Sequence, residues 1–218
     1  MVKQGSHRRP VPDGDTEQRI LDAAHAVFVR TGTAGARMQE IAKEAGVNSA
    51  LLHYYFRSKA RLSEAVFIRA AQQLLPAVIG VLASDLPLEK KVARVVEVEI
   101  DNLSAAPFLP GYILSELTHH PERVRLLVGS ATGKRPEDVG GDVLGGIRRQ
   151  IEAAVRAGKM RPIAPEQLVV NLLALCVFPF AARPLLMAML SLDERGFARF
   201  MTRRRSELPA FFLAALRP

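Results

Sequence analysis

A short stretch of the sequence, residues 47–63, combines positive charge with hydrogen-bonding side chains and contains no carboxylate. Its cations are Arg57, Lys59 and Arg61, and one histidine and two adjacent tyrosines precede them. Cations, phenols and imidazoles without competing acids can bind the phosphate oxygens of a polyanion. The stretch therefore predicts a surface on which something negatively charged docks.

A second group of residues that could support chemistry is Glu116 with His119 and His120. Adjacent histidines on a helix point about 100° apart, so these two cannot easily share a metal ion. No spacing typical of a nucleophile and its base accompanies them. We expect no metal site and no cofactor, and a small helical enzyme that uses Glu116 and His119 stays open as an alternative.

Composition and hydropathy limit the class of protein. The 218 residues and the net charge of +8 allow two domains and lean mildly toward polyanionic partners. The polar start of the chain predicts a disordered arm over residues 1–14 and lacks the apolar core of a secretory signal. The most apolar segment, residues 167–192, is interrupted by Asn171, Pro179, Arg183 and Pro184. We expect a cytoplasmic protein without a membrane span.

Helical spacing organises the first third of the chain. Ile20, Ala23, Ala24, Val27 and Phe28 predict one apolar face of a helix over residues 16–30. A second helix, over residues 38–45, ends at a glycine. A third begins after an asparagine cap at position 48 and continues to about residue 55. Two short helices joined by a tight glycine-containing turn predict a helix-turn-helix.

The remaining elements are also expected to be helices. A long fourth helix starts at Ser58, and Pro76 suggests a kink or an early end within it. Further helical patterns lie near residues 87–104, 109–118, 121–130, 136–157, 165–190 and 193–216. The fold class is therefore all-α. We expect a helix-turn-helix domain over residues 15–62, with a linker helix from about residue 58, and a second domain over residues 63–218.

The residues from Ile41 to Leu62, IAKEAGVNSALLHYYFRSKARL, resemble the helix-turn-helix of the TetR family of bacterial transcriptional regulators. The resemblance covers about residues 16–68. It implies an N-terminal three-helix DNA-binding domain and a larger C-terminal helical domain for ligand binding and dimerisation. The positions in register are Ile41, Ala42, Ala45, Gly46, Val47, Leu52, Tyr55, Phe56, Ser58, Lys59 and Leu62.

The resemblance also implies that the third helix enters the major groove of operator DNA. His53 stands where the family usually has a phosphate-contacting tyrosine, and Tyr55 is either a contact or a half-buried core residue. Arg37 replaces the usual threonine at the start of the second helix. Leu51 stands where a polar or small residue often reads bases, and it could meet a thymine methyl. The expected DNA-binding residues are Arg37, Asn48, Ser49, Leu51, His53, Tyr54, Tyr55, Arg57 and Lys59.

In the C-terminal two thirds, apolar stripes on the last helices are typical of an internal core. In the TetR family the last two long helices commonly pair with their copies in a four-helix interface. The resemblance therefore implies a homodimer. The run Arg203, Arg204 and Arg205 is expected to be a solvated face. The expected interface residues are Leu168, Leu172, Leu175, Phe197, Phe200, Met201, Leu208 and Phe211.

A small-molecule pocket is expected where apolar side chains surround a few polar ones. Cys176, the single cysteine, lies in the apolar stretch ALCVFPF and is expected to be a small buried hydrophobe, although it is also a pocket candidate. The candidate ligand-binding residues are Phe108, Tyr112, Glu116, His119, Cys176, Phe178 and Phe180.

The leading hypothesis is a dimeric repressor, released from a palindromic operator by a small apolar or aromatic effector. A constitutive DNA-binding regulator without an effector is the main alternative.

Overall fold

The computed structural model describes residues 14–218, and every regular element among them is a helix. This confirms the all-α fold class. The chain divides into two compact units, of which the first ends at Phe67 and the second begins at Ile68. The predicted N-terminal arm, residues 1–14, lies outside the described residues apart from Gly14, which begins the first helix.

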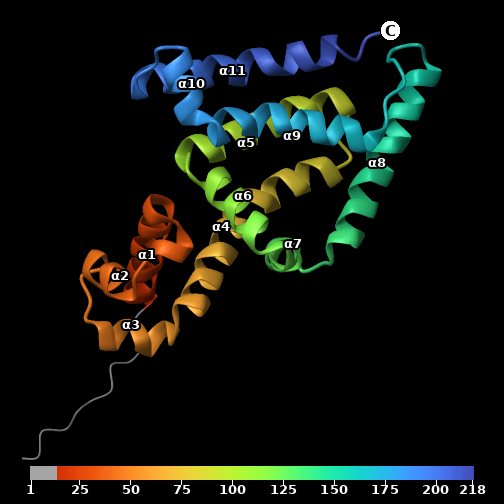
Figure 1. Ribbon diagram of the computed structural model, residues 1–218. Helices are drawn as coiled ribbons and strands as arrows, with labels where there is room; N and C mark the ends of the chain where they lie inside the picture. Colours follow the sequence, from red (N-terminus) through yellow and green to blue (C-terminus); the bar gives the residue numbers. More distant parts are fainter. Residues whose placement is uncertain (1–13) are drawn as a thin grey trace, which may run out of the picture. The chain divides into compact units, whose positions relative to one another are not determined.

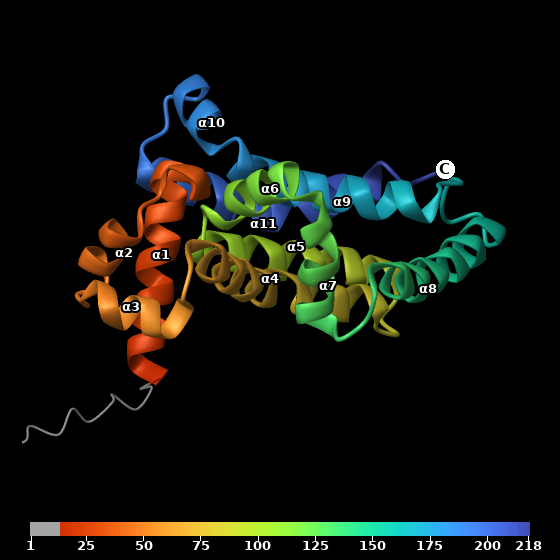
Figure 2. The same cartoon turned by 60° about the horizontal axis from the view of Figure 1, so that its bottom comes forward.

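The first unit contains three helices, α1 (Gly14–Gly35), α2 (Met38–Glu44) and α3 (Ser49–Phe56), which Figure 2 shows together. The apolar face expected on α1 is buried, and α1 packs against α2, which packs against α3. Gly32 interrupts α1 with a φ of 69°, so the regular part of the helix ends near the predicted position. Gly46, with a φ of 66°, makes the turn between α2 and α3.

Helix α4 (Lys59–Ala83) carries the chain from the first unit into the second. The expectation that Pro76 could end this helix is wrong, because α4 continues to Ala83. Proline leaves the carbonyl of Gln72 without its helical donor. Both residues are exposed, so water can take the place of the missing N–H group.

The second unit is built around α5 (Leu88–Ala105), which packs against three other helices (Figure 1). Its partners are α8 (Pro136–Arg156), α9 (Pro165–Ala181) and α11 (Glu194–Ala214). The shorter elements are α6 (Leu109–His119), η1 (Pro121–Arg123), α7 (Val124–Thr132) and α10 (Arg183–Met189). The core is formed by valine, leucine and isoleucine side chains of α5 together with side chains of α8, α9 and α11.

One expected helix, residues 165–190, is two helices in the structure. Helices α9 and α10 meet at Ala182 with a bend of 72°. Pro184 explains the break, because it has no N–H group to donate to the carbonyl of Phe180 and so cannot continue α9. The chain therefore changes direction at the point where the sequence contains Arg183 and Pro184.

Among the described residues, α4 is long and apolar enough to cross a membrane, with a mean hydropathy of 1.6. Helices α9 and α10 together also meet this criterion of length and hydropathy if they are taken as one bent span. The core helix of a folded domain also satisfies this measure. Leu62, Val66, Phe67, Val78 and Leu82 of α4 are buried within the structure. In the apolar window of α4 as a whole, 33% of the residues are buried within the structure.

Candidate nucleic-acid interface

Helix α3 has an apolar inner face and an exposed polar outer face. Leu52 and Phe56 are buried, whereas Ser49, His53 and Tyr54 are exposed. Residues 47–63 contain no carboxylate, so no acid of this segment lies beside the outer face. Exposed serine, histidine and tyrosine side chains can donate hydrogen bonds to phosphate oxygens and base edges.

The N-terminus of α3 is held by Asn48. Its side-chain oxygen accepts a hydrogen bond from the backbone N–H of Leu51, with an N–O distance of 2.7 Å. This cap satisfies one of the free amides of the helix. Asn48 therefore has a structural role in addition to the DNA contact that the sequence predicts. Leu51 is half-buried, so only part of its side chain is exposed on the outer face.

Lys59 connects two parts of the first unit. Its ammonium group donates to the carbonyl oxygens of Ala34 and Ala36, at 2.9 and 3.2 Å. Ala34 lies at the end of α1 and Ala36 follows that helix, so Lys59 fastens the first residue of α4 to the C-terminal end of α1. An ammonium group has three N–H donors, which leaves one for a phosphate. The sequence contained no signal for this contact, because its partners are backbone atoms.

The turn between α3 and α4 has an unusual backbone at Arg57, where φ is 53° and ψ is −38°. A residue with a side chain at positive φ costs about 1–3 kcal/mol, which the surroundings must offset. The N–H of Arg57 donates to the carbonyl of His53 at 2.9 Å, and the Ser58 hydroxyl accepts from the N–H of Arg61 at 3.3 Å. These bonds set the angle at which α4 leaves α3.

Tyr54 and Tyr55 lie differently although they are adjacent. The two rings meet edge to face with centroids 5.7 Å apart, and Tyr55 is half-buried with its ring stacked against Phe56. Tyr54 remains 47% exposed. Of the two, Tyr54 has the side chain that is free to reach a bound polyanion. Arg37 is also exposed, at the N-terminus of α2.

The residues expected to form an effector pocket are not gathered at one place. Tyr112, Cys176 and Phe180 are buried, whereas Phe108, His119 and Phe178 are exposed. These three exposed side chains therefore do not line an enclosed pocket in this structure. On α9 the cause is helical geometry, since Cys176 and Phe180 are four positions apart and share the buried face, whereas Phe178 lies two positions from each.

Polar atoms of the Glu116 region are already occupied. Glu116 is buried and forms an ion pair with Arg123, and the Nδ1 atom of His119 lies 2.8 Å from the carbonyl oxygen of Ser115. These contacts explain both side chains as structural. Among residues 14–218, no group of three or more histidine, cysteine or acidic side chains could hold a metal ion.

Glu99 is a buried acid that the sequence analysis missed. It lies on the inner face of α5 and is 7% exposed, and its Oε2 atom has no hydrogen-bond partner in the described structure. Burial raises the pKa of Glu99 to about 7. The pKa of the Cys176 thiol is raised to about 12, mainly by burial and to a smaller extent by the charge of Glu99. Glu99 therefore lies close enough to Cys176 for its charge to act on the thiol.

Five of the residues expected at a dimer interface are core residues of the single chain, which corrects that expectation. Leu168 and Leu172 of α9 and Phe197, Met201 and Leu208 of α11 are buried in the core of the second unit. Their side chains pack inside the chain and are not available to a partner.

The exposed apolar side chains of α9 and α11 lie on other faces. Phe211, which was expected at an interface, is 66% exposed, and Leu175 and Phe200 are half-buried. Val170 and Phe178 were not expected there, yet both are exposed. Helix α9 is apolar nearly all round, so its sequence could not show which of its faces is turned inward.

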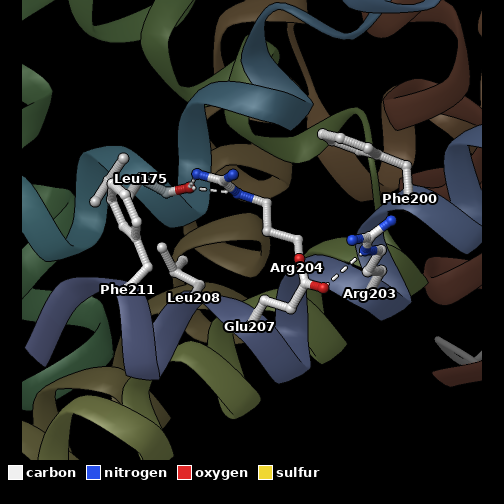
Figure 3. A pocket seen from close by; sticks show the side chains of 7 residues that line it. All are labelled: Leu175, Phe200, Arg203, Arg204, Glu207, Leu208 and Phe211. Atoms are coloured by element: carbon white, nitrogen blue, oxygen red, sulfur yellow. Dashed lines mark hydrogen bonds and ion pairs between the residues drawn. The ribbon is translucent and has the colours of Figure 1, made fainter. Parts of the chain in front are cut away.

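Two shallow grooves cover this exposed face, each with a volume of about 420–430 Å³. Figure 3 shows the first groove, which is lined by side chains of α11 and by Leu175 of α9 at one end. The second is lined by Asn171, Ala174, Leu175, Phe178, Arg204, Phe211, Phe212 and Ala215. Leu175, Arg204 and Phe211 line both grooves.

Comparison with known proteins agrees with the geometry of the first unit. Residues 20–66 match the family model described as bacterial regulatory proteins, tetR family. HTH-type transcriptional repressor SCO4008 of Streptomyces coelicolor is 33% identical over 112 residues, which is 50% of this chain and 57% of that protein. HTH-type transcriptional regulator SrpR of Pseudomonas putida is 40% identical over 52 residues, 24% of each chain. The chain thus spans less than two thirds of the length of these curated relatives.

Solved structures resemble nearly the whole chain. A mutant of HlyIIR with a linker containing two thrombin sites has a TM-score of 0.60 and 20% identity, over 92% of this chain and 96% of that one. The fatty acid degradation regulator FadR from Bacillus halodurans has a TM-score of 0.54 and 18% identity, over 93% and 97%. At such identities the likeness shows the fold alone. The names of the curated relatives indicate regulators and not enzymes.

Proposed function

The chain belongs to the TetR family of bacterial regulatory proteins, and we propose that it is a homodimeric transcriptional repressor that a small effector releases from operator DNA. The observation that carries this proposal is the outer face of α3. Ser49, His53 and Tyr54 are exposed there, in a segment without acids, while Leu52 and Phe56 anchor the helix from behind. A face of this kind fits the major groove of double-stranded DNA.

The grooved face of α9 and α11 supports the proposal of a homodimer. Phe178 and Phe211 are large apolar side chains exposed to solvent on this face. A two-fold axis would bring the same face of a second copy against it, which is the commonest arrangement in soluble dimers. Paired recognition helices then meet DNA about 34 Å apart, so the operator is a near-palindrome. Such a regulator works in the cytoplasm.

The effector is a small, largely apolar or aromatic molecule. The buried carboxyl group of Glu99 indicates that this molecule also carries a hydrogen-bond donor. Tyr112, Cys176 and Phe180 are the expected pocket residues that face inward. With Glu116 held by Arg123, the carboxyl group left to orient an effector is that of Glu99. A buried carboxyl group without a partner is costly, and a ligand that donates a hydrogen bond relieves this cost. We therefore expect an amine or hydroxyl on an apolar skeleton.

The test begins with the purified full-length chain and a pool of random double-stranded DNA. Repeated selection, followed by gel-shift assays on the selected sequence and on DNA upstream of the gene, should yield one near-palindromic site. Failure to enrich any sequence would contradict the proposed DNA-binding function.

A library of small molecules then separates a ligand-responsive repressor from a constitutive one. Amine-bearing apolar compounds should raise the melting temperature and weaken operator binding together. Ligands that raise the melting temperature without changing operator affinity would favour the constitutive alternative, because a ligand shifts an equilibrium only by its differential affinity for the two states.

A further inference from the structure

A proline inside α9 leaves one backbone carbonyl without its usual donor. In an α-helix the carbonyl of residue 175 accepts from the N–H of residue 179. Residue 179 is Pro179, which lies inside α9 and has no N–H group. The Leu175 carbonyl therefore needs a donor from outside its own helix.

Arg204 of α11 provides that donor. Its Nε and one terminal nitrogen both donate to the Leu175 carbonyl oxygen, at 3.1 and 2.9 Å, as Figure 3 shows. The two neighbouring arginines do something else. Arg203 pairs with Glu207 on its own helix, and Arg205 pairs with Asp101 and Glu97 of α5. The expectation that all three form one solvated face is thus wrong for Arg204, while Arg203 and Arg205 form ion pairs at the surface.

The clamp formed by Arg204 and the Leu175 carbonyl lies within the grooved face. Both residues line both grooves, and Phe211 lines both as well. Phe178, one position before Pro179, lines the second groove. The contact therefore joins α9 to α11 beside the second groove, which is also lined by the exposed side chains of Phe178 and Phe211.

We propose that Arg204 is a positioning residue of the homodimer interface, which it controls by fixing α9 against α11 through the Leu175 carbonyl. This inference rests on the proposed homodimer. Two planar N–H donors on one acceptor restrict the relative rotation and sliding of the helices. The aromatic side chains on α9 and α11 then form one surface of constant shape, to which an identical surface of a second copy can be complementary.

The chemistry of Pro179 provides an internal test of this mechanism. Replacing Arg204 by alanine leaves the Leu175 carbonyl without a donor. Replacing Pro179 by alanine as well restores an N–H group at the position from which a helix normally donates. The restored N–H group pairs the carbonyl within α9 but does not join α9 to α11. If Arg204 acts by joining the two helices, Pro179→Ala should therefore not compensate for the loss of Arg204, whereas recovery in the double variant would show that only the unpaired carbonyl matters.

The experiment measures the dimer dissociation constant by sedimentation for the full-length wild type, Arg204→Ala, Pro179→Ala and the double variant. Arg204→Ala should weaken dimerisation about tenfold, by the loss of charge-assisted hydrogen bonds. The double variant should dimerise as weakly as Arg204→Ala does. Arg199→Ala, which removes the same charge from an exposed site on α11 outside both grooves, is the matched control and should dimerise as the wild type does.

Arg204→Lys keeps the charge and tests the planar two-donor geometry if Arg204→Ala folds poorly. It should weaken dimerisation less than Arg204→Ala but measurably. Wild-type affinity in Arg204→Ala and Arg204→Lys, or a double variant that regains wild-type affinity, would overturn the role of Arg204. A wild-type chain that stays monomeric at micromolar concentration would instead overturn the proposed homodimer itself.

Discussion

The substitution Glu99→Gln tests the most unusual electrostatic feature of the second unit. Burial raises the pKa of Glu99 from its ordinary value of 4.5 to about 7. Below pH 4.5 the group is protonated in the folded and the unfolded chain alike, and it causes no loss of stability. Between pH 4.5 and 7 only the unfolded chain releases the proton, so stability falls as pH rises.

Above pH 7 the loss reaches its full value, which for this pKa shift is about 3 kcal/mol. Glutamine has nearly the shape of protonated glutamate and does not ionise. Glu99→Gln should therefore leave stability near pH 4.5 almost unchanged and increase it at pH 8, by up to about 3 kcal/mol.

The assay is urea unfolding of the wild type and the variant at several pH values between 4.5 and 8, at one fixed protein concentration because association also affects stability. Glu89→Gln removes an exposed carboxylate from the same helix and is the control. The reasoning is refuted if Glu99→Gln and the wild type lose stability in parallel as pH rises, because another group would then carry the dependence.

Three further substitutions test the proposed DNA interface and the grooved face of α9 and α11. Lys59→Ala should lower the salt slope of operator binding by about one and should also lower the melting temperature, since the carbonyls of Ala34 and Ala36 lose their donor; an unchanged slope would remove Lys59 from the DNA interface. Tyr54→Ala should weaken operator binding with little change in melting temperature, because the side chain is largely exposed; a large fall in the melting temperature would instead assign Tyr54 to the core. Phe211→Arg should shift the dimer toward monomer in sedimentation, since it puts a charge on the grooved face, and unaltered dimerisation would show that this face is not the interface.

The sequence predicted the helices well, because their signals are local. The spacing of Ile20, Val27 and Phe28, the cap at Asn48 and the glycine at position 46 each act within a few residues. The break at Ala182 also has a local cause, Pro184, but the continuous apolar pattern of residues 165–190 concealed it. Local propensity and periodicity therefore determined most elements of the fold.

The sites were less predictable, because their contacts join distant parts of the chain. Leu168 and Leu172 were assigned to an interface since apolar spacing does not distinguish a face turned to the core from one turned to a partner. Lys59 bonds to two backbone carbonyls that have no signature in the sequence. Pro179 indicates an unpaired carbonyl at Leu175, but the sequence does not show that Arg204 is its donor. Glu99 is an acid among apolar residues of α5, and its burial depends on how α5 packs against α9 and α11.

The central claim is that two copies of the α3 outer face bind operator DNA together. Hydroxyl-radical footprinting of the purified protein on its selected operator tests this most directly. We predict two protected half-sites related by two-fold symmetry, with centres about one helical turn, or 34 Å, apart. Protection should disappear in Tyr54→Ala at protein concentrations that saturate the wild type. A single asymmetric footprint, or none at any concentration, would contradict the account.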